Sequence, residues 1–70
     1  SMNQMMMALL RANPQAFRNN NVNQLKSGAM LAIPKQGEIT QLSREEAKNA
    51  FQQQYKDWKS GVASAPPPKV

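Results

Sequence analysis

The sequence predicts a mainly α-helical domain with one or two short strands, an α+β arrangement. An apolar stripe at helical spacing near the start, a short apolar run that a proline ends, and a capped amphipathic stretch near the end predict this class. The 70 residues make at most one domain, whose core is too small for more than marginal stability. We expect three successive parts, over residues 1–42, 43–60 and 61–70.

The first element is a predicted helix over residues 3–12. Apolar residues recur at i, i+3, i+4, i+7 and i+8, which places them on one face; they are Met2, Met5, Met6, Leu9 and Leu10. Met7 is apolar but lies off this stripe. Because methionine fills irregular gaps in cores, core packing is the favoured interpretation of the stripe, and a docking face is the alternative. Asn13 and Pro14 should end the helix, because the residue before a proline is disfavoured in the α region.

A predicted loop covers residues 13–28. It contains an asparagine-rich stretch, and asparagine tolerates left-handed backbone and bonds to its own neighbours; these residues are Asn19, Asn20, Asn21 and Asn23. We expect their amides to face solvent, and hydrogen bonds to sugar hydroxyls are the alternative. Val22 and Leu25 are expected to fix the loop to the core.

A predicted strand covers residues 29–33. It follows a turn at Gly28 and is an apolar run long enough for one buried strand. Pro34 ends it, because proline has no N–H to give to a ladder. A turn around Gly37 and a second extended piece at Ile39 are weaker expectations.

The clearest predicted element is a helix over residues 43–60. Ser43 and Glu46 form the S-x-x-E pattern of a capping box, and Gly61 supplies a C-terminal stop. An apolar face follows at helical spacing, and it consists of Ala47, Ala50, Phe51, Tyr55 and Trp58. We expect these rings to pack in the core, with Trp58, near the helix end, partly exposed. Residues 61–70 are proline-rich and read as an extended linker.

Composition favours a binding or scaffolding role over catalysis. The chain has no histidine and no cysteine, so the usual bases, nucleophiles and transition-metal ligands are missing, and we expect no enzyme activity, metal or cofactor. Its net charge is +5, and residues 1–35 contain no acid. A basic half suits a polyanion, an anionic membrane or an anionic cell-wall polymer. The basic residues are scattered singly, so nucleic-acid binding is not expected.

Two resemblances sharpen this interpretation. The spacing Leu-x-x-Gly-x-x-Leu-x-Ile-Pro over residues 25–34, preceded by a helix, resembles the second half of a LysM module, a small β-α-α-β unit that binds cell-wall glycan. Residues 4–17 and 23–34, with the later Leu-Ser-Arg-Glu-Glu-Ala run at 42–47, resemble the periplasmic region of the FimV family, inner-membrane polar hub proteins related to HubP and TspA. Residues 1–42 then form an incomplete LysM-like unit, because the first strand, turn and helix of that module are absent from this sequence.

The resemblance implies a peptidoglycan-binding segment in the periplasm that helps to anchor type IV pilus or cell-pole machinery. Membrane attachment is then expected only through parts of a longer protein. The glycan-contacting residues carried over from the family pattern are Asn13, Pro14, Gln15, Gly28 and Met30. The rival expectation is an interaction module without glycan binding, which uses the Met2–Leu10 stripe. The backbone groups of an unpaired strand over residues 29–33 need partners, so we expect it to pair with a second copy of itself, with the segment around Ile39, or with nothing stable. Pairing with a second copy would give a homodimer that also buries the methionine stripe.

Overall fold

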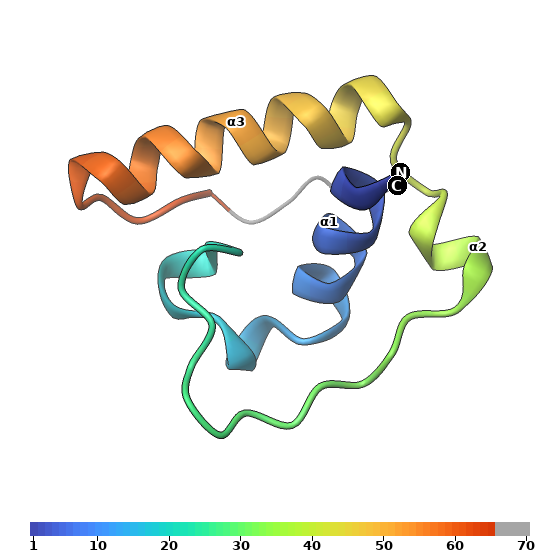
Figure 1. Ribbon diagram of the computed structural model, residues 1–70, viewed down its shortest axis with the longest axis horizontal. Helices are drawn as coiled ribbons and strands as arrows, with labels where there is room; N and C mark the ends of the chain where they lie inside the picture. Colours follow the sequence, from blue (N-terminus) through green and yellow to red (C-terminus); the bar gives the residue numbers. More distant parts are fainter. Residues whose placement is uncertain (66–70) are drawn as a thin grey trace.

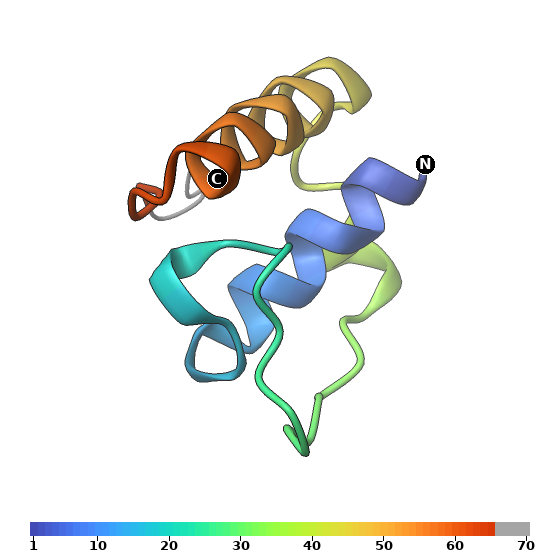
Figure 2. The ribbon, with the colours of Figure 1, turned by 60° about the vertical axis from the view of Figure 1, so that its left-hand side comes forward.

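The structure is a computed structural model that describes residues 1–65. The elements are helix α1 (Met2–Ala12), the 3-10 turns η1 (Pro14–Ala16) and η2 (Arg18–Asn20), and helices α2 (Gln36–Ile39) and α3 (Arg44–Ser60). In Figure 1, α3 crosses above α1, and the chain from η2 to α2 runs around the other side of α1. Figure 2 shows α3 above α1 from another direction, and the two helices are in contact. The expected mainly helical class is confirmed.

Helix α1 is the centre of the packing, and its predicted position is confirmed. Ser1 caps its start, since the Ser1 hydroxyl accepts from the Gln4 N–H and the Gln4 side chain accepts from the N-terminal amine. The predicted buried face is only partly correct. Met7, which lies off the predicted stripe, is fully buried, whereas Met2 is 75 % exposed. The reason is that α3 and the loops cover α1 from more than one side, so the buried region is wider than one stripe.

The hydrophobic core joins residues from distant parts of the chain. Its buried members are Met7, Leu10, Ala16, Phe17, Val22, Leu42 and Ala47. Partly buried apolar side chains pack against them, and these are Met6, Ala29, Leu31, Ala50 and Phe51. The core is therefore built from α1, the turns after it, the entry to α3 and the first half of α3.

Helix α3 begins and ends as predicted. The Ser43 hydroxyl accepts from the Glu46 N–H at 3.1 Å, and the Glu46 carboxylate accepts from the Ser43 N–H at 3.1 Å, which completes the capping box. Gly61 has a φ of 72°, the left-handed conformation that commonly ends helices. The Val62 N–H then bonds to the Asp57 carbonyl oxygen at 3.0 Å.

The predicted apolar face of α3 is correct only for its first half. Ala47 is buried and Phe51 packs on the core, but Tyr55 and Trp58 are 46 % and 45 % exposed. The buried position one turn after Ala50 belongs to Gln54 instead. Trp58 is exposed as expected, while core packing of Tyr55 is wrong.

The predicted strand over residues 29–33 is absent. These residues have no regular secondary structure, and Met30 and Ile33 are 91 % and 77 % exposed. Within residues 1–65, strand-like pairing is confined to one isolated antiparallel bridge, between Phe17 and Leu25. A strand needs a neighbouring strand to satisfy its backbone groups, and none of the described segments supplies one here.

Two further expectations need correction. The extended piece expected at Ile39 is part of the short helix α2, which packs on α1. The expected linker over residues 61–70 is held to the domain at Ser64, which is buried and whose N–H bonds to the Asn19 carbonyl oxygen at 2.9 Å. The remainder of that linker prediction, residues 66–70, lies outside the described residues.

Candidate functional site

The side chain of Asn13 joins the end of α1 to the loop at Ala32 through hydrogen bonds. Asn13 is 2 % exposed, and its amide donates to the carbonyl oxygens of Leu9 at 3.0 Å and Ala32 at 2.9 Å. Its oxygen accepts from the Ala32 N–H at 2.7 Å. Both amide hydrogens are therefore engaged inside the protein. The expected glycan contact by Asn13 does not fit this arrangement, because burial and internal bonding leave no amide hydrogen for a sugar.

The bonds from Asn13 bring two predicted site segments together. The loop 13–16 is joined to the segment 26–32 at two points, because the Asn13 amide pairs with the backbone of Ala32 and the Lys26 N–H donates to the Ala16 carbonyl oxygen at 2.8 Å. Pro14, Gln15, Gly28 and Met30 are all exposed. Gly28 has a φ of 76°, a left-handed conformation that residues with a side chain rarely adopt, and this conformation forms the turn before Met30. Four of the five predicted glycan-contacting residues therefore lie on the surface of two neighbouring loops.

The predicted interaction stripe on α1 is largely covered. Leu10 is buried, and Met5, Met6 and Leu9 are half-buried, so Met2 alone of the five residues is exposed. As an exposed docking face, this stripe does not fit the structure.

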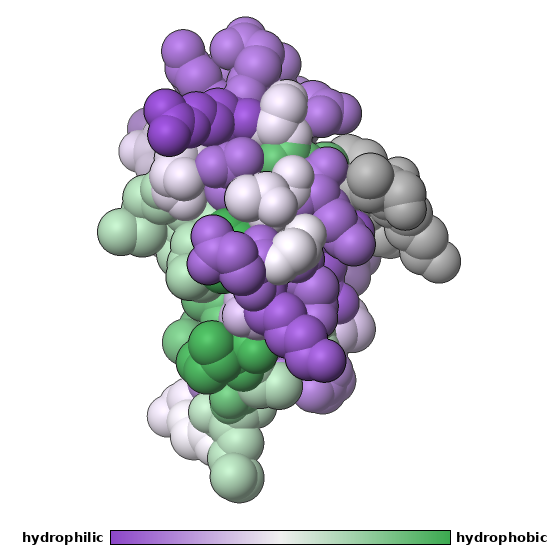
Figure 3. Space-filling view, turned by 90° about the vertical axis from the view of Figure 1, so that its right-hand side faces the viewer, coloured by the Kyte–Doolittle hydropathy of each residue, from purple (hydrophilic) through white to green (hydrophobic). Residues whose placement is uncertain are grey.

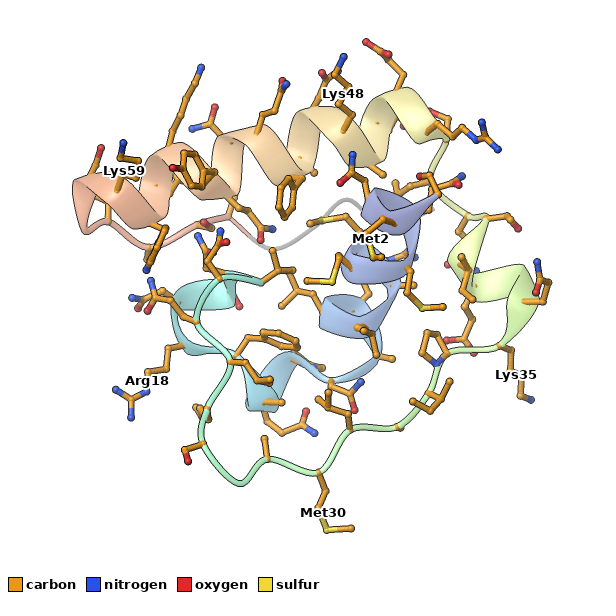
Figure 4. The ribbon with its side chains drawn as sticks, viewed as in Figure 1. Met2, Arg18, Met30, Lys35, Lys48 and Lys59 are labelled. Atoms are coloured by element: carbon orange, nitrogen blue, oxygen red, sulfur yellow. The ribbon has the colours of Figure 1, made fainter. Side chains whose placement is uncertain are left out.

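Exposed apolar side chains gather instead along residues 25–33. Leu25 is about half-exposed, and Met30 and Ile33 are the most exposed large apolar residues of this segment. Figure 3 shows apolar residues concentrated at the end of this face opposite α3, and Figure 4 shows Met30 pointing away from the body of the protein. The segment therefore offers an apolar surface at the edge of the domain.

A buried amide cluster joins the asparagine-rich loop to α3. The Asn21 amide donates to the Gln54 carbonyl oxygen at 2.6 Å and to the Ser64 hydroxyl at 2.9 Å. The Gln54 side-chain oxygen accepts from the Val22 N–H at 2.9 Å. Asn21 is fully buried, which corrects the expectation of a solvated loop for this residue. Sequence alone offers no signal for this cluster, because the same asparagines suit an exposed loop.

Charge and titration add two features. Residues 1–35 contain Arg11, Arg18, Lys26 and Lys35 and no acid, so this part of the surface is positive. Hydrogen bonds from the backbone and then the hydroxyl of Ser43 lower the pKa of Glu46.

Among residues 1–65 there is no cluster of side chains suited to holding a metal ion. In the same residues, no helix is long and apolar enough to cross a membrane.

Comparison with known proteins gives one clear relationship. No family model and no solved structure matches the chain. Over 59 residues, 84 % of this chain, it is 39 % identical to the motility hub protein FimV of two Pseudomonas aeruginosa strains. The chain spans only 6 % of the length of those relatives. It therefore belongs to the FimV family, as the counterpart of one short segment of that motility hub protein.

Proposed function

We propose that this chain is a non-enzymatic segment of a FimV-like motility hub protein and that it binds peptidoglycan. In this proposal the segment lies in the periplasm, where binding to the cell wall helps to anchor type IV pilus or cell-pole machinery. The 39 % sequence identity to a protein named as a motility hub supports the scaffold part of the proposal. The LysM-like spacing of residues 25–34 supports the glycan part.

The observation that carries the glycan proposal is the juxtaposition of the two loops at Asn13. Gln15 offers an exposed amide that can donate to and accept from sugar hydroxyls. Pro14 and Met30 offer exposed apolar atoms for the C–H faces of a sugar ring. A few polar groups beside apolar contacts is the usual composition of a small-ligand site.

Co-sedimentation with purified peptidoglycan sacculi tests this proposal. Binding should persist at moderate salt and fall when soluble N-acetylglucosamine oligomers compete, because bonds to neutral sugars depend little on ionic strength. Gln15→Ala together with Met30→Ala should weaken binding several-fold. The matched control is Gln52→Ala, an exposed change on α3. The glycan role would be refuted if binding were lost at moderate salt and changed neither with the competitor nor with the substitution of Gln15 and Met30.

Self-association is the second candidate, and the apolar segment 25–33 favours it. Met30 and Ile33 are exposed on this segment, and pairing of residues 29–33 with a second strand would replace the bonds that the Ala32 backbone makes to Asn13. A homodimer would form by pairing these segments, with little help from the partly covered methionine helix. Light scattering over a wide concentration range should then show a dimer mass that Ile33→Asp abolishes. A monomer mass at every concentration would exclude this candidate.

A further inference from the structure

The second half of α3 carries an aromatic row that the core does not use. Phe51, Tyr55 and Trp58 follow one another at i, i+4 and i+7, so they lie along one side of the helix. Phe51 is half-buried against the core, while the other two rings are about half exposed. The centroids of the Tyr55 and Trp58 rings are 5.9 Å apart with a tilt of 51°, a contact that holds both rings on the surface.

An open hollow accompanies this row. Its volume is about 530 Å³, and it is lined by Phe51, Gln52, Tyr55 and Lys56. These residues form two adjacent rows of the helix surface, 51 with 55 and 52 with 56, each at a spacing of four. The groove between two such rows is where a side-chain ridge of another helix enters when helices pack. The hollow therefore lies where a side-chain ridge of a facing helix would enter.

The margin of this groove is positively charged. The Lys59 ammonium lies 5.6 Å from the centroid of the Tyr55 ring, and Lys56 lines the hollow itself. Figure 4 shows Lys48 and Lys59 projecting from α3 away from α1. Asp57 is the one acid between residues 51 and 60.

The Asp57 carboxylate is already engaged on its own side of the helix. Its two oxygens accept from the Gln53 amide at 3.0 Å and the Ser64 hydroxyl at 2.9 Å. The bond from Ser64 ties Asp57 to the chain that follows α3, and the bond from Gln53 lies within the helix. The lysines are therefore the charges that an incoming partner meets at the groove.

We propose that this groove docks an acidic amphipathic helix of a partner protein. An apolar ridge of that helix enters the hollow against Phe51 and Tyr55, and its carboxylates meet Lys56 and Lys59. A second copy of this chain is a poorer occupant, because each copy carries a net charge of +5. A glycan fits less well, because the tilted rings form no single flat platform and Lys59 lies over Tyr55. The proposal is independent of peptidoglycan binding by the loops.

Trp58 provides a direct readout, because it is the only tryptophan of the chain. The probe is a synthetic amphipathic peptide of roughly 20 residues, long enough to form a helix, with leucine on one face and glutamate flanking it. A matched peptide has lysine in place of every glutamate. Titration of the full 70-residue chain with the acidic peptide should shift the Trp58 emission to shorter wavelength and saturate. The lysine peptide should bind at least about tenfold more weakly.

Charge exchange makes the test specific. Lys56→Glu with Lys59→Glu should weaken binding of the acidic peptide at least about tenfold and should strengthen binding of the lysine peptide. Lys26→Glu with Lys35→Glu is the matched control, since it makes the same change in net charge at exposed loop positions. If charge reversal weakens the fold, glutamine at positions 56 and 59 removes the charge without adding acid.

Three results would overturn the proposal. Equal weakening in both charge variants would show attraction to net charge alone. A shift of Trp58 emission with protein concentration, without peptide, would show that a second copy covers the groove. A shift produced by soluble peptidoglycan fragments but not by the acidic peptide would assign the aromatic pair to glycan.

Discussion

Replacing Asn13 with alanine should release residues 28–34 from the end of α1. The substitution removes the hydrogen bonds to the Leu9 carbonyl oxygen and to both backbone groups of Ala32, with lengths of 3.0, 2.9 and 2.7 Å. Asn13 is also almost fully buried, so the change leaves a small gap beneath the loop. We therefore expect both lower stability and a looser loop.

The magnitude follows from the partners that are left behind. A hydrogen bond contributes about 0.5–1.5 kcal/mol net, so the three bonds together contribute about 1.5–4.5 kcal/mol. Ala32 is exposed, and its N–H and carbonyl can bond to water after the substitution, so the expected loss of stability is about 2 kcal/mol. For a chain of this size such a loss lowers the melting temperature by about 8–16 °C. It is also a large share of a total stability of roughly 5 kcal/mol.

Urea unfolding, followed by helical circular dichroism, measures this loss. The control is Asn49→Ala, an exposed position on α3 where alanine favours the helix and stability should not fall. Hydrogen exchange should show that the Ala32 amide loses protection in the Asn13 variant. A change in stability below about 0.5 kcal/mol, the range of ordinary surface substitutions, would refute the fastening role of Asn13.

The other predictions concern the core, a helix end and a cap. Met7→Ala should cost about 2–5 kcal/mol in chemical denaturation, because Met7 is fully buried, whereas Met30→Ala should cost almost nothing. Gly61→Ala should cost about 1–2 kcal/mol at the left-handed helix end, while Gly37→Ala inside α2 should not destabilise; matched urea curves would show the difference. Because the pKa of Glu46 is lowered on folding, its contribution is complete above the unfolded pKa of about 4.3 and is lost as the pH falls through the folded pKa. Glu46→Gln should remove that part of the acid dependence, and an unchanged acid-unfolding curve would contradict this.

The sequence by itself determined the two long helices. The capping residues of α3, Ser43 and Glu46, act on backbone groups within three positions, and Gly61 acts at the adjoining turn. The apolar recurrence before Asn13 likewise predicts α1. These signals are local, so no distant contact was needed to interpret them. The exposure of Pro14 and Gln15 is also what their assignment to a loop predicts.

Only the tertiary structure decided which polar residues lie inside. The sequence does not distinguish an asparagine that bonds to solvent from Asn13 or Asn21, whose partners lie 19 and 33 positions away. The strand expected over residues 29–33 failed for a related reason. A strand requires a ladder partner from elsewhere in the chain, and the backbone of Ala32 pairs with a side chain instead.

The faces of α3 show the same division between local and distant causes. Helical spacing groups Phe51, Tyr55 and Trp58 on one side, but it does not say how far the opposing helix extends. Helix α3 has 17 residues and α1 has 11, so α1 matches only part of the length of α3. Gln54 turns inward to bond with the asparagine loop, and the rings of Tyr55 and Trp58 remain at the surface. Periodicity determined which residues share a side of the helix, and the length and position of the packed neighbours determined which of them are buried.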